Sequence, residues 1–478
     1  MFLDENAVPF TGGTYFPPQE LQGRPSFNSV LENVSKVYQE NRDKILNQAD
    51  QMKMVFRELN KKNAVLKQDL EPYVEKIINY TDEINGGFKG APKFPQFYIF
   101  DTILHFYNKT KNKKYLDVVE KLLLSLSSKG IYDHLEGGIS RYTVDEKWIV
   151  PHFEKMLYDN IQYVNLLNNY LSNKENNYLK QKLIQTIKFI NSEFIVKNNL
   201  LGSAYDADSD GIEGKYYVWK YQELKDILGN DLEIFKKKYQ ISEQGNFEAS
   251  NILVENLDPN ISTDSKILEI EQKLLEIRKK RNKPFFDDKT QLDLNSLMLS
   301  ALVTANEILP EKKYLKLAED FFSKIEKKYI KNKIYHSYSQ DIVFIEDYAF
   351  LISSLIDLSD KTMNFRYKDL AKKLLYEAIN KFYLSDKNIF QKNPISNDDV
   401  FFKPIDIGDN TIPNGNAIML INFVKLGMME EAKKLSESLN GYLNIYKNHM
   451  MTSLRAIDFF NNINKGKNCN EQGCKIDA

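Results

Sequence analysis

Apolar residues recur at three- and four-residue spacing along most of this chain, which places them on one face of successive α-helices. The segments come in pairs, in which one member is more apolar and the next is more charged. This alternation predicts antiparallel hairpins of inner and outer helices, which close into an α/α toroid around a central cavity. The predicted helices are 25–46, 97–110, 114–130, 152–171, 178–194, 294–309, 313–330, 346–359, 367–384, 415–427 and 430–446.

Two regions fall outside the helical pattern. Residues 1–18, MFLDENAVPFTGGTYFPP, are expected to form two short extended pieces around a turn, followed by a glycine-rich bend. Residues 215–219, KYYVW, are expected to form a short strand in a hairpin. Because an isolated hairpin is marginally stable in water, each hairpin needs partners from elsewhere in the fold.

The charge balance and the cysteines limit the partners of the chain. Its 65 basic and 66 acidic residues nearly cancel, so no field steers a nucleic acid toward it. No apolar run approaches the ~20 residues that cross a bilayer, and the first residues do not resemble a signal peptide. The two cysteines, Cys469 and Cys474, exclude a disulfide framework and agree with a reducing compartment. We therefore expect a cytoplasmic protein that binds neither nucleic acid nor membrane.

The loops that precede the inner helices of a toroid gather at one mouth of its cavity. Four segments are unusually rich in glycine, acidic residues, histidine and aromatic residues: 86–96, 131–159, 204–219 and 284–295. Exposed loops rarely hold this mixture for packing alone. The four segments together therefore predict a binding site at the mouth.

The longest of these segments, 131–159, carries most of the candidate residues. Pro151 is expected to begin a helix, which would place His152 and Asp159 on one face and Glu154 and Tyr158 on another. Carboxylates and arginine bind hydroxyl groups, and aromatic rings stack on the C–H face of a sugar, so we expect a polyhydroxylated ligand. A histidine beside acids also suits proton transfer near neutral pH. The remaining candidates in this loop are Asp133, His134, Arg141, Tyr142, Asp145 and Trp148.

Each of these residues taken alone has a simpler explanation as core or as a solvated ion pair; the density of the cluster is what favours a site.

The segment 204–219, AYDADSDGIEGKYYVW, raises a different alternative, because its spacing of aspartates and glycine resembles a calcium loop. An EF-hand needs a bidentate acid at its twelfth position, where this segment has Tyr217.

We therefore expect no metal in the 204–219 segment and predict that Asp206 and Asp208 point into a sugar-sized cavity. Calcium binding stays the weaker alternative. A turn closed by aspartate hydrogen bonds is the structural alternative, above all for Asp210. Glu213 and Trp219 complete the candidates of this segment.

Further candidates stand at the starts of later helices. Asp287, Asp288 and Lys289 either hold a substrate hydroxyl or cap the helix that carries Asn295. Asp347 lies at a helix start, where the helix dipole favours an acid in any case. Asn416 begins a late inner helix in a similar way. The sequence has no serine–histidine–aspartate arrangement, phosphate-binding glycine loop or His/Cys metal spacing, so we expect no cofactor.

Six motifs occur in a fixed order: GGFKGAPKFP, the 131–159 loop, AYDADSDGIEGKYYVW, FFDDK with a later asparagine, EDYAFLI and PNGNA. Together they closely resemble the family of thioredoxin-domain proteins that includes the spermatogenesis-associated thioredoxin-like protein. The resemblance covers nearly the whole chain. It implies an N-terminal thioredoxin-like domain followed by an (α/α)6 toroid similar to six-hairpin glycosidases and N-acylglucosamine 2-epimerases.

The sequence departs from the family pattern at its beginning. Residues 1–18 resemble only the closing hairpin of the thioredoxin-like domain, so we expect residues 1–62 to be the remnant of that α/β domain in a truncated or mis-started chain. Residues 63–466 are expected to form the toroid and 467–478 a flexible tail with a Cys-x4-Cys pair. Leu294 and Ser296 also replace the tryptophan and glycine of a Trp-Asn-Gly motif, and Glu136 replaces a glycine.

The sequence leaves two classes of function open. The first is a carbohydrate-binding or carbohydrate-active protein, of the epimerase, isomerase or glycosidase type. Proton abstraction would use His134 or His152, whereas hydrolysis would use two carboxylates among Glu154, Asp206 and Asp208. The second is a non-catalytic scaffold in a redox or quality-control system, which would bind a protein partner through an apolar cavity mouth.

Overall fold

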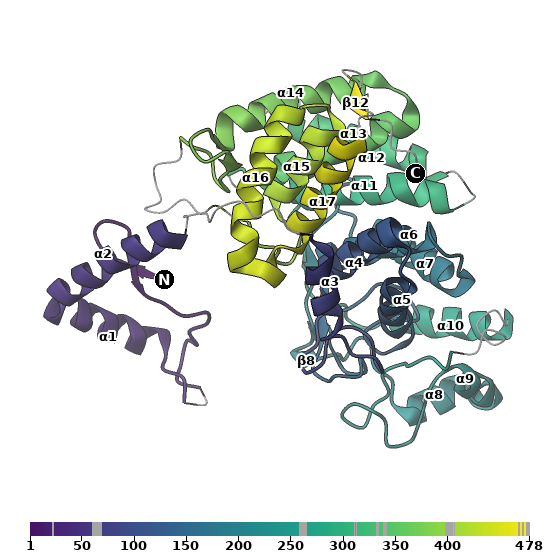
Figure 1. Cartoon of the computed structure of the whole chain (residues 1–478). Helices are drawn as coiled ribbons and strands as arrows, with labels where there is room; N and C mark the ends of the chain where they lie inside the picture. Colours follow the sequence, from purple (N-terminus) through teal and green to yellow (C-terminus); the bar gives the residue numbers. More distant parts are fainter. Residues whose placement is uncertain are drawn as a thin grey trace.

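In the computed structural model, six helices among the described residues form a closed ring, because each contacts the next and the last contacts the first (Figure 1). The ring helices are α4 (Phe97–Thr110), α6 (Leu157–Leu171), α11 (Leu292–Ile308), α13 (Ile345–Thr362), α15 (Gly415–Lys425) and α17 (Met451–Gly466). The structure describes residues 1–21, 23–59, 69–257, 265–309, 311, 313–330, 334–337, 342–396, 405, 407–466, 469–470 and 473–474.

A second layer of helices packs around this ring. Each outer helix contacts a ring helix next to it in the sequence. The outer helices are α3 (Glu71–Ile78), α5 (Lys113–Ser128), α7 (Asn177–Glu193), α12 (Lys313–Ile325), α14 (Phe365–Phe382) and α16 (Met429–Tyr446). The arrangement confirms the predicted (α/α)6 toroid.

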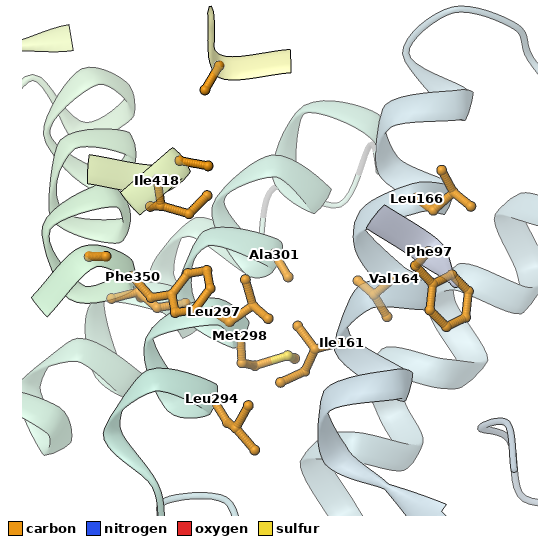
Figure 2. Packing of buried hydrophobic residues seen from close by; sticks show 14 of the residues in the cluster. Phe97, Ile161, Val164, Leu166, Leu294, Leu297, Met298, Ala301, Phe350 and Ile418 are labelled. Carbon is orange, nitrogen blue, oxygen red and sulfur yellow. The ribbon is translucent and has the colours of Figure 1, made fainter. Parts of the chain in front are cut away.

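Burial explains why the chain divides its helices between two layers. The ring helix α13 buries consecutive residues from Ile345 to Ile352, because it touches neighbours on all sides. The outer helix α12 buries residues three and four apart, including Tyr314, Ala318 and Phe321, which form a single apolar stripe. Figure 2 shows ring contacts from close by, where Ile161 of α6 and Met298 of α11 point toward one another. Both residues are fully buried.

A small helical insertion between α7 and α11 has a core of its own. It contains α8 (Tyr221–Leu228), the 3-10 turn η1 (Gly229–Asp231), α9 (Leu232–Lys238) and α10 (Ser265–Arg278). Its core gathers Trp219, Phe235 and Leu274 among other buried residues. The sequence pattern did not predict this insertion.

The two ends of the described chain carry short strand pairs. Strands β1 (Phe2–Leu3) and β2 (Pro9–Thr11) pair antiparallel, as predicted. They precede α1 (Phe27–Glu40) and α2 (Arg42–Leu59), and the predicted domain boundary at residue 62 lies outside the described residues. In the tail, β12 (Cys469–Asn470) and β13 (Gly473–Cys474) pair so that Cys469 and Cys474 stand opposite each other.

Two local predictions are wrong. Pro151 does not begin a helix, because Pro151 and His152 form strand β4 (Pro151–His152), which pairs with β3 (Tyr142–Thr143), and α6 begins only at Leu157. Residues 215–219 are not a strand either, because the amides of Tyr217 and Val218 bond back to the carbonyl of Gly214 and form a turn. In both places, hydrogen bonds to the surrounding backbone override the local sequence preference.

The strands of this region are formed by other residues than the predicted 215–219. A three-stranded sheet joins β5 (Lys155–Met156), β6 (Ala204–Tyr205) and β9 (Phe286–Asp287). Beyond it, β7 (Asp208–Ser209) and β8 (Ile212–Glu213) form a hairpin. One further hairpin, β10 (Tyr383–Leu384) and β11 (Ile389–Phe390), precedes α15.

Among the residues described above, no helix is both long and apolar enough to cross a membrane.

Candidate functional site

A cavity of about 330 Å³ opens where four ring helices begin. Consecutive helices in the toroid run antiparallel, so the ring helices all point the same way and their preceding loops share one end. The cavity lies between the starts of α4 and α6 and the loops that precede α15 and α17. Its lining consists of Phe94, Pro95, Gln96, Phe97, Tyr98, Arg141, Tyr158, Asp159, Gln162, Asp409, Asn410, Thr411 and His449.

A stack of aromatic rings borders this cavity. Phe94 stacks on Tyr142 with ring centroids 4.7 Å apart, and Tyr142 stacks on His152 at 5.0 Å. The His152 Nδ1 atom lies 2.7 Å from Oε1 of Glu213, and Arg141 donates to Glu154 over 3.2 Å. The 131–159 loop and the 204–219 segment therefore meet beside the cavity.

A tight hairpin turn positions Glu213 for this contact. Asp210 and Gly211 occupy the two loop positions between Ser209 and Ile212, and both have positive φ angles. Such a turn favours Asp-Gly, because both central residues must adopt the left-handed conformation. The Asp210 carboxylate bonds to Lys215 at 2.8 Å and to Asn282 at 2.9 Å. These contacts account for Asp210 as a turn residue.

Three residues of the cavity lining hold buried polar atoms that have no hydrogen-bond partner in the described chain. They are the Tyr158 hydroxyl, Oδ2 of Asp159 and Oε1 of Gln162. Burial raises the pKa of the Asp159 carboxyl well above its ordinary value, Arg141 opposes the shift, and Glu154 adds to it. The neutral form of Asp159 is therefore favoured, and it can donate a hydrogen bond or a proton.

We expect the substitution Asp159→Asn to stabilise the chain at pH 8 and to leave its stability nearly unchanged at pH 4. Because the folded chain holds the Asp159 proton more tightly than the unfolded chain, the contribution of Asp159 to stability is present at acidic pH and lost as the pH rises. At pH 8 the substitution removes the cost of a buried charge whose oxygen has no partner, which should add about 1–3 kcal/mol. Urea unfolding of both proteins at the two pH values measures the difference, and an equal gain at both would contradict the assignment.

Several predicted site residues lie outside the cavity lining. The Asp133 carboxylate receives two hydrogen bonds from Arg278, at 2.8 and 2.9 Å, and one from Lys155 at 2.7 Å. These cations hold the pKa of Asp133 well below its usual range. Glu136 joins the same network through Arg278 at 3.2 Å. Because these partners use both oxygens of Asp133, we propose that it ties α10 of the insertion to the ring.

His134 belongs to a second buried cluster, beside the outer helix α7. Its Nε2 atom lies 3.0 Å from the carbonyl oxygen of Lys129, and its Nδ1 atom lies 3.2 Å from Nζ of Lys182 and 3.3 Å from Oε1 of Glu255. Burial lowers the pKa of His134, which favours the neutral imidazole. We propose a structural role for it.

The two tryptophans and Asp145 also lie away from the cavity. Trp148 is 0% exposed and donates from its indole nitrogen to the carbonyl of Asn85 at 3.0 Å. Asp145 receives hydrogen bonds from backbone amides of its own loop, including that of Val150 at 2.6 Å. Trp219 is buried in the core of the insertion.

Two asparagines that the sequence predicted as site residues form hydrogen bonds with the backbone of other segments. Asn295 pairs with both the amide and the carbonyl of Leu201, at 2.9 and 3.1 Å. Asn416 pairs in the same way with Phe390, at 2.9 Å each. Both are completely buried, and we propose that they hold these segments onto the ring.

The predicted acids of the rim lie on the surface. The side chains of Asp206 and Asp208 are exposed beside and within the β7–β8 hairpin. Asp287 forms an ion pair with Lys289 at 3.0 Å, and Asp288 is exposed next to it. Asp347, by contrast, is fully buried at the start of α13, close to His336.

Some residues of the cavity were not predicted, because they are brought there by distant parts of the chain. Asp409 receives hydrogen bonds from the amides of Asn414 and Thr452, at 3.1 and 2.8 Å, and so joins the loop before α15 to the first turn of α17. Gln162 lies one turn along α6 from Tyr158 and donates to the carbonyl of Thr411 at 2.6 Å. Its helical spacing from Tyr158 was the one local signal for it.

The comparisons with known sequences agree with the predicted relationship. Residues 1–57 match the Thioredox_DsbH family, described as a protein of unknown function, DUF255. The uncharacterized protein B0495.5 of Caenorhabditis elegans is 25% identical over 499 residues and matches 92% of this chain. Human spermatogenesis-associated protein 20 is 24% identical over 442 residues and matches 78% of it. The family resemblance is confirmed. The chain spans 68% of the nematode protein and 56% of the human protein.

Solved structures that resemble the chain include two sugar-processing proteins. Cellobiose 2-epimerase from Bacillus thermoamylovorans aligns with a TM-score of 0.46 at 12% identity, over 84% of each chain. A GH76 α-mannanase of Bacteroides thetaiotaomicron aligns with a TM-score of 0.40 at 11% identity, over 83% of this chain and 84% of its own.

Proposed function

We propose that the cavity at the starts of α4 and α6 binds a small polyhydroxylated, sugar-like molecule, which makes the chain carbohydrate-binding or carbohydrate-active. The observation that carries the proposal is the trio of unpartnered buried atoms on Tyr158, Asp159 and Gln162 in one cavity wall. Buried polar groups are nearly always hydrogen-bonded. A ligand that brings several hydroxyl groups satisfies all three.

The rest of the lining supports the same ligand class. Arg141 and His449 supply donors, and Phe94 offers a ring that is 38% exposed, suited to the C–H face of a sugar. A volume of about 330 Å³ lies at the small end of the ~300–1,000 Å³ that ligand pockets occupy. The proposal therefore names a mono- or disaccharide.

For a reaction, we propose Asp159 as the acid and His152 as the base. Asp159 holds its proton because it is buried, and His152 lies beside the cavity between Glu213 and Glu154, whose carboxylates are 2.7 and 3.8 Å from its ring nitrogens. An acid and a base of this kind serve epimerisation or isomerisation through proton transfer. Glycoside hydrolysis would instead pair Asp159 with Glu154.

A thermal-shift experiment tests the binding. We expect one class of mono- or disaccharide to raise the melting temperature of the full chain, because a ligand that binds the folded state stabilises it by mass action. Asp159→Asn and Arg141→Ala should abolish the rise. Asp369→Asn removes an exposed carboxylate of the outer helix α14 and should keep it. The melting transition of Asp159→Asn without sugar shows that the variant is folded, and we expect it at a higher temperature than that of wild type at pH 8.

The alternative function, a scaffold for a protein partner, requires an apolar cavity mouth. Arg141, Asp159, Asp409 and His449 make this mouth polar, which favours the sugar. If no sugar shifts the melting temperature of the wild-type chain, the sugar proposal fails and the scaffold becomes the better explanation. A cytoplasmic location, without nucleic-acid partners, is also part of the proposal.

A further inference from the structure

A second polar cluster lies at the same end of the ring, at the starts of α11 and α13. Asp293 is the second residue of α11, Asp347 is the third residue of α13, and His336 lies in the loop before α13. One donor atom from each residue lies within 4.8 Å of the other two. His336 Nδ1 is 3.0 Å from Oδ1 of Asp347 and 3.8 Å from Oδ1 of Asp293.

The cluster gathers two buried carboxylates around a single imidazole. Asp293 and Asp347 are 6% and 0% exposed. In the described part of the chain no lysine or arginine forms an ion pair with either carboxylate, and His336 is the single cation-forming group that does. Two buried carboxylates that face each other across one imidazole repel. A divalent cation at the point between them would compensate both charges.

Contacts behind the donors orient them toward this point. The Oδ2 atom of Asp347 accepts a hydrogen bond from the backbone amide of Phe344 at 2.8 Å. Its other oxygen, Oδ1, faces His336. His336 Nε2 lies 2.9 Å from Nε2 of Gln291. Turning the Gln291 side-chain amide so that its oxygen accepts from Nε2–H leaves the lone pair of Nδ1 for a metal ion. Metal-binding histidines are commonly held in this way through their second ring nitrogen.

Asp293 has few hydrogen-bond partners among the described residues. Among the described residues, its carboxylate receives hydrogen bonds only from amides of its own helical turn, at Leu294 and at Asp293 itself. A carboxylate that is more than nine-tenths buried normally has stronger partners. Its Oδ1 atom, which accepts the Leu294 amide, also lies 3.8 Å from Nδ1 of His336.

We propose that Asp293, His336 and Asp347 bind one divalent transition-metal ion. One imidazole nitrogen with two carboxylate oxygens suits Mn²⁺ or Zn²⁺, whereas Ca²⁺ and Mg²⁺ prefer all-oxygen sites. The His336 side chain is 16% exposed, so the ion and further ligands such as water can reach the site. This inference goes beyond the sugar cavity, which uses other residues.

The probe is Mn²⁺, added to the full chain after removal of any purification tag and dialysis against a chelator. Mn²⁺ is chosen because it has little affinity for thiolates, so Cys469 and Cys474 do not interfere. Electron paramagnetic resonance counts the bound ion, and competition with Zn²⁺ is measured on the same samples. We expect one equivalent to bind wild-type protein and Zn²⁺ to displace it.

Asp293→Asn and His336→Gln should each weaken Mn²⁺ binding at least ~10-fold, and Asp369→Asn on the outer helix should leave it unchanged. Circular dichroism of the metal-free variants checks their fold. Asp293→Asn is the safer variant, because it removes one of two facing carboxylates without removing a cap of α13. The proposal is overturned if millimolar Mn²⁺ does not bind, or if it binds the folded variants as tightly as wild type. The cluster is then an ion pair that fixes the two helix starts.

Discussion

The substitution Asp133→Ala is expected to lower the free energy of unfolding by about 3–5 kcal/mol, which is typical of breaking a buried ion pair. Asp133 receives three charged hydrogen bonds, two from Arg278 and one from Lys155. Without its carboxylate, two buried cations face the single acid Glu136. Urea unfolding at pH 7, followed by circular dichroism, measures the loss.

A double variant separates this explanation from a general effect of the mutation. Asp133→Ala combined with Arg278→Met leaves Lys155 and Glu136, one charge of each sign, and should recover a large part of the lost stability. Asp369→Ala, on the exposed face of α14, should cost less than about 0.5 kcal/mol. If the double variant is as unstable as the sum of its two single variants, the charges in this network are not coupled.

The toroid could be predicted from the sequence because its two layers bury different fractions of their helices. Ring helices such as α13 bury residues on every side, whereas outer helices such as α12 bury one stripe. The order of apolar and charged residues along each helix reflects this difference in burial. The insertion around Trp219 lacks such regularity, since its core joins short helices to separate loop segments.

The wrong local predictions concern residues whose structure depends on distant backbone. Pro151 is a common first residue of a helix, yet it pairs with Thr143 in a strand. Lys155, four residues later, pairs with Tyr205. Such pairings are fixed by the packing of whole segments, so a window of neighbouring residues cannot contain the signal.

The composition of the 131–159 loop predicted a polar cluster. It did not predict which of its residues line the cavity and which are held by buried partners. Asp133 and Arg141 are both charged members of this loop, yet Asp133 is neutralised by Arg278, which follows it by 145 positions, and Arg141 lines the cavity. His134 and His152 differ in the same way. The side chain of His134 is completely buried beside Glu255, and that of His152 is partly exposed beside Glu213. Residue type indicates chemistry, and the tertiary partners decide whether that chemistry is already used.

Trp148 also belongs to the 131–159 loop but is held by buried partners. Its substitution is the second one for which we expect a large effect on stability. We expect Trp148→Ala to lower the free energy of unfolding by about 3–5 kcal/mol, as large-to-small changes of buried aromatic residues do. The indole fills a space against Gly87, where a Cβ atom would lie 2.7 Å from the ring. Its nitrogen also donates to the carbonyl of Asn85, which would be left unpaired. Thermal and urea unfolding measure the loss.

Phe94→Ala is the matched control, because this aromatic residue is 38% exposed, lines the cavity and stacks on Tyr142. It should cost little stability but reduce the melting-temperature rise that the sugar produces. Trp148→Ala should do the reverse when binding is measured at a temperature where the variant is folded. If instead Trp148→Ala unfolds like wild type and loses the sugar, the tryptophan acts on the ligand, as its place in the 131–159 loop predicts. The two variants together decide which aromatic side chain holds the fold and which one meets the ligand.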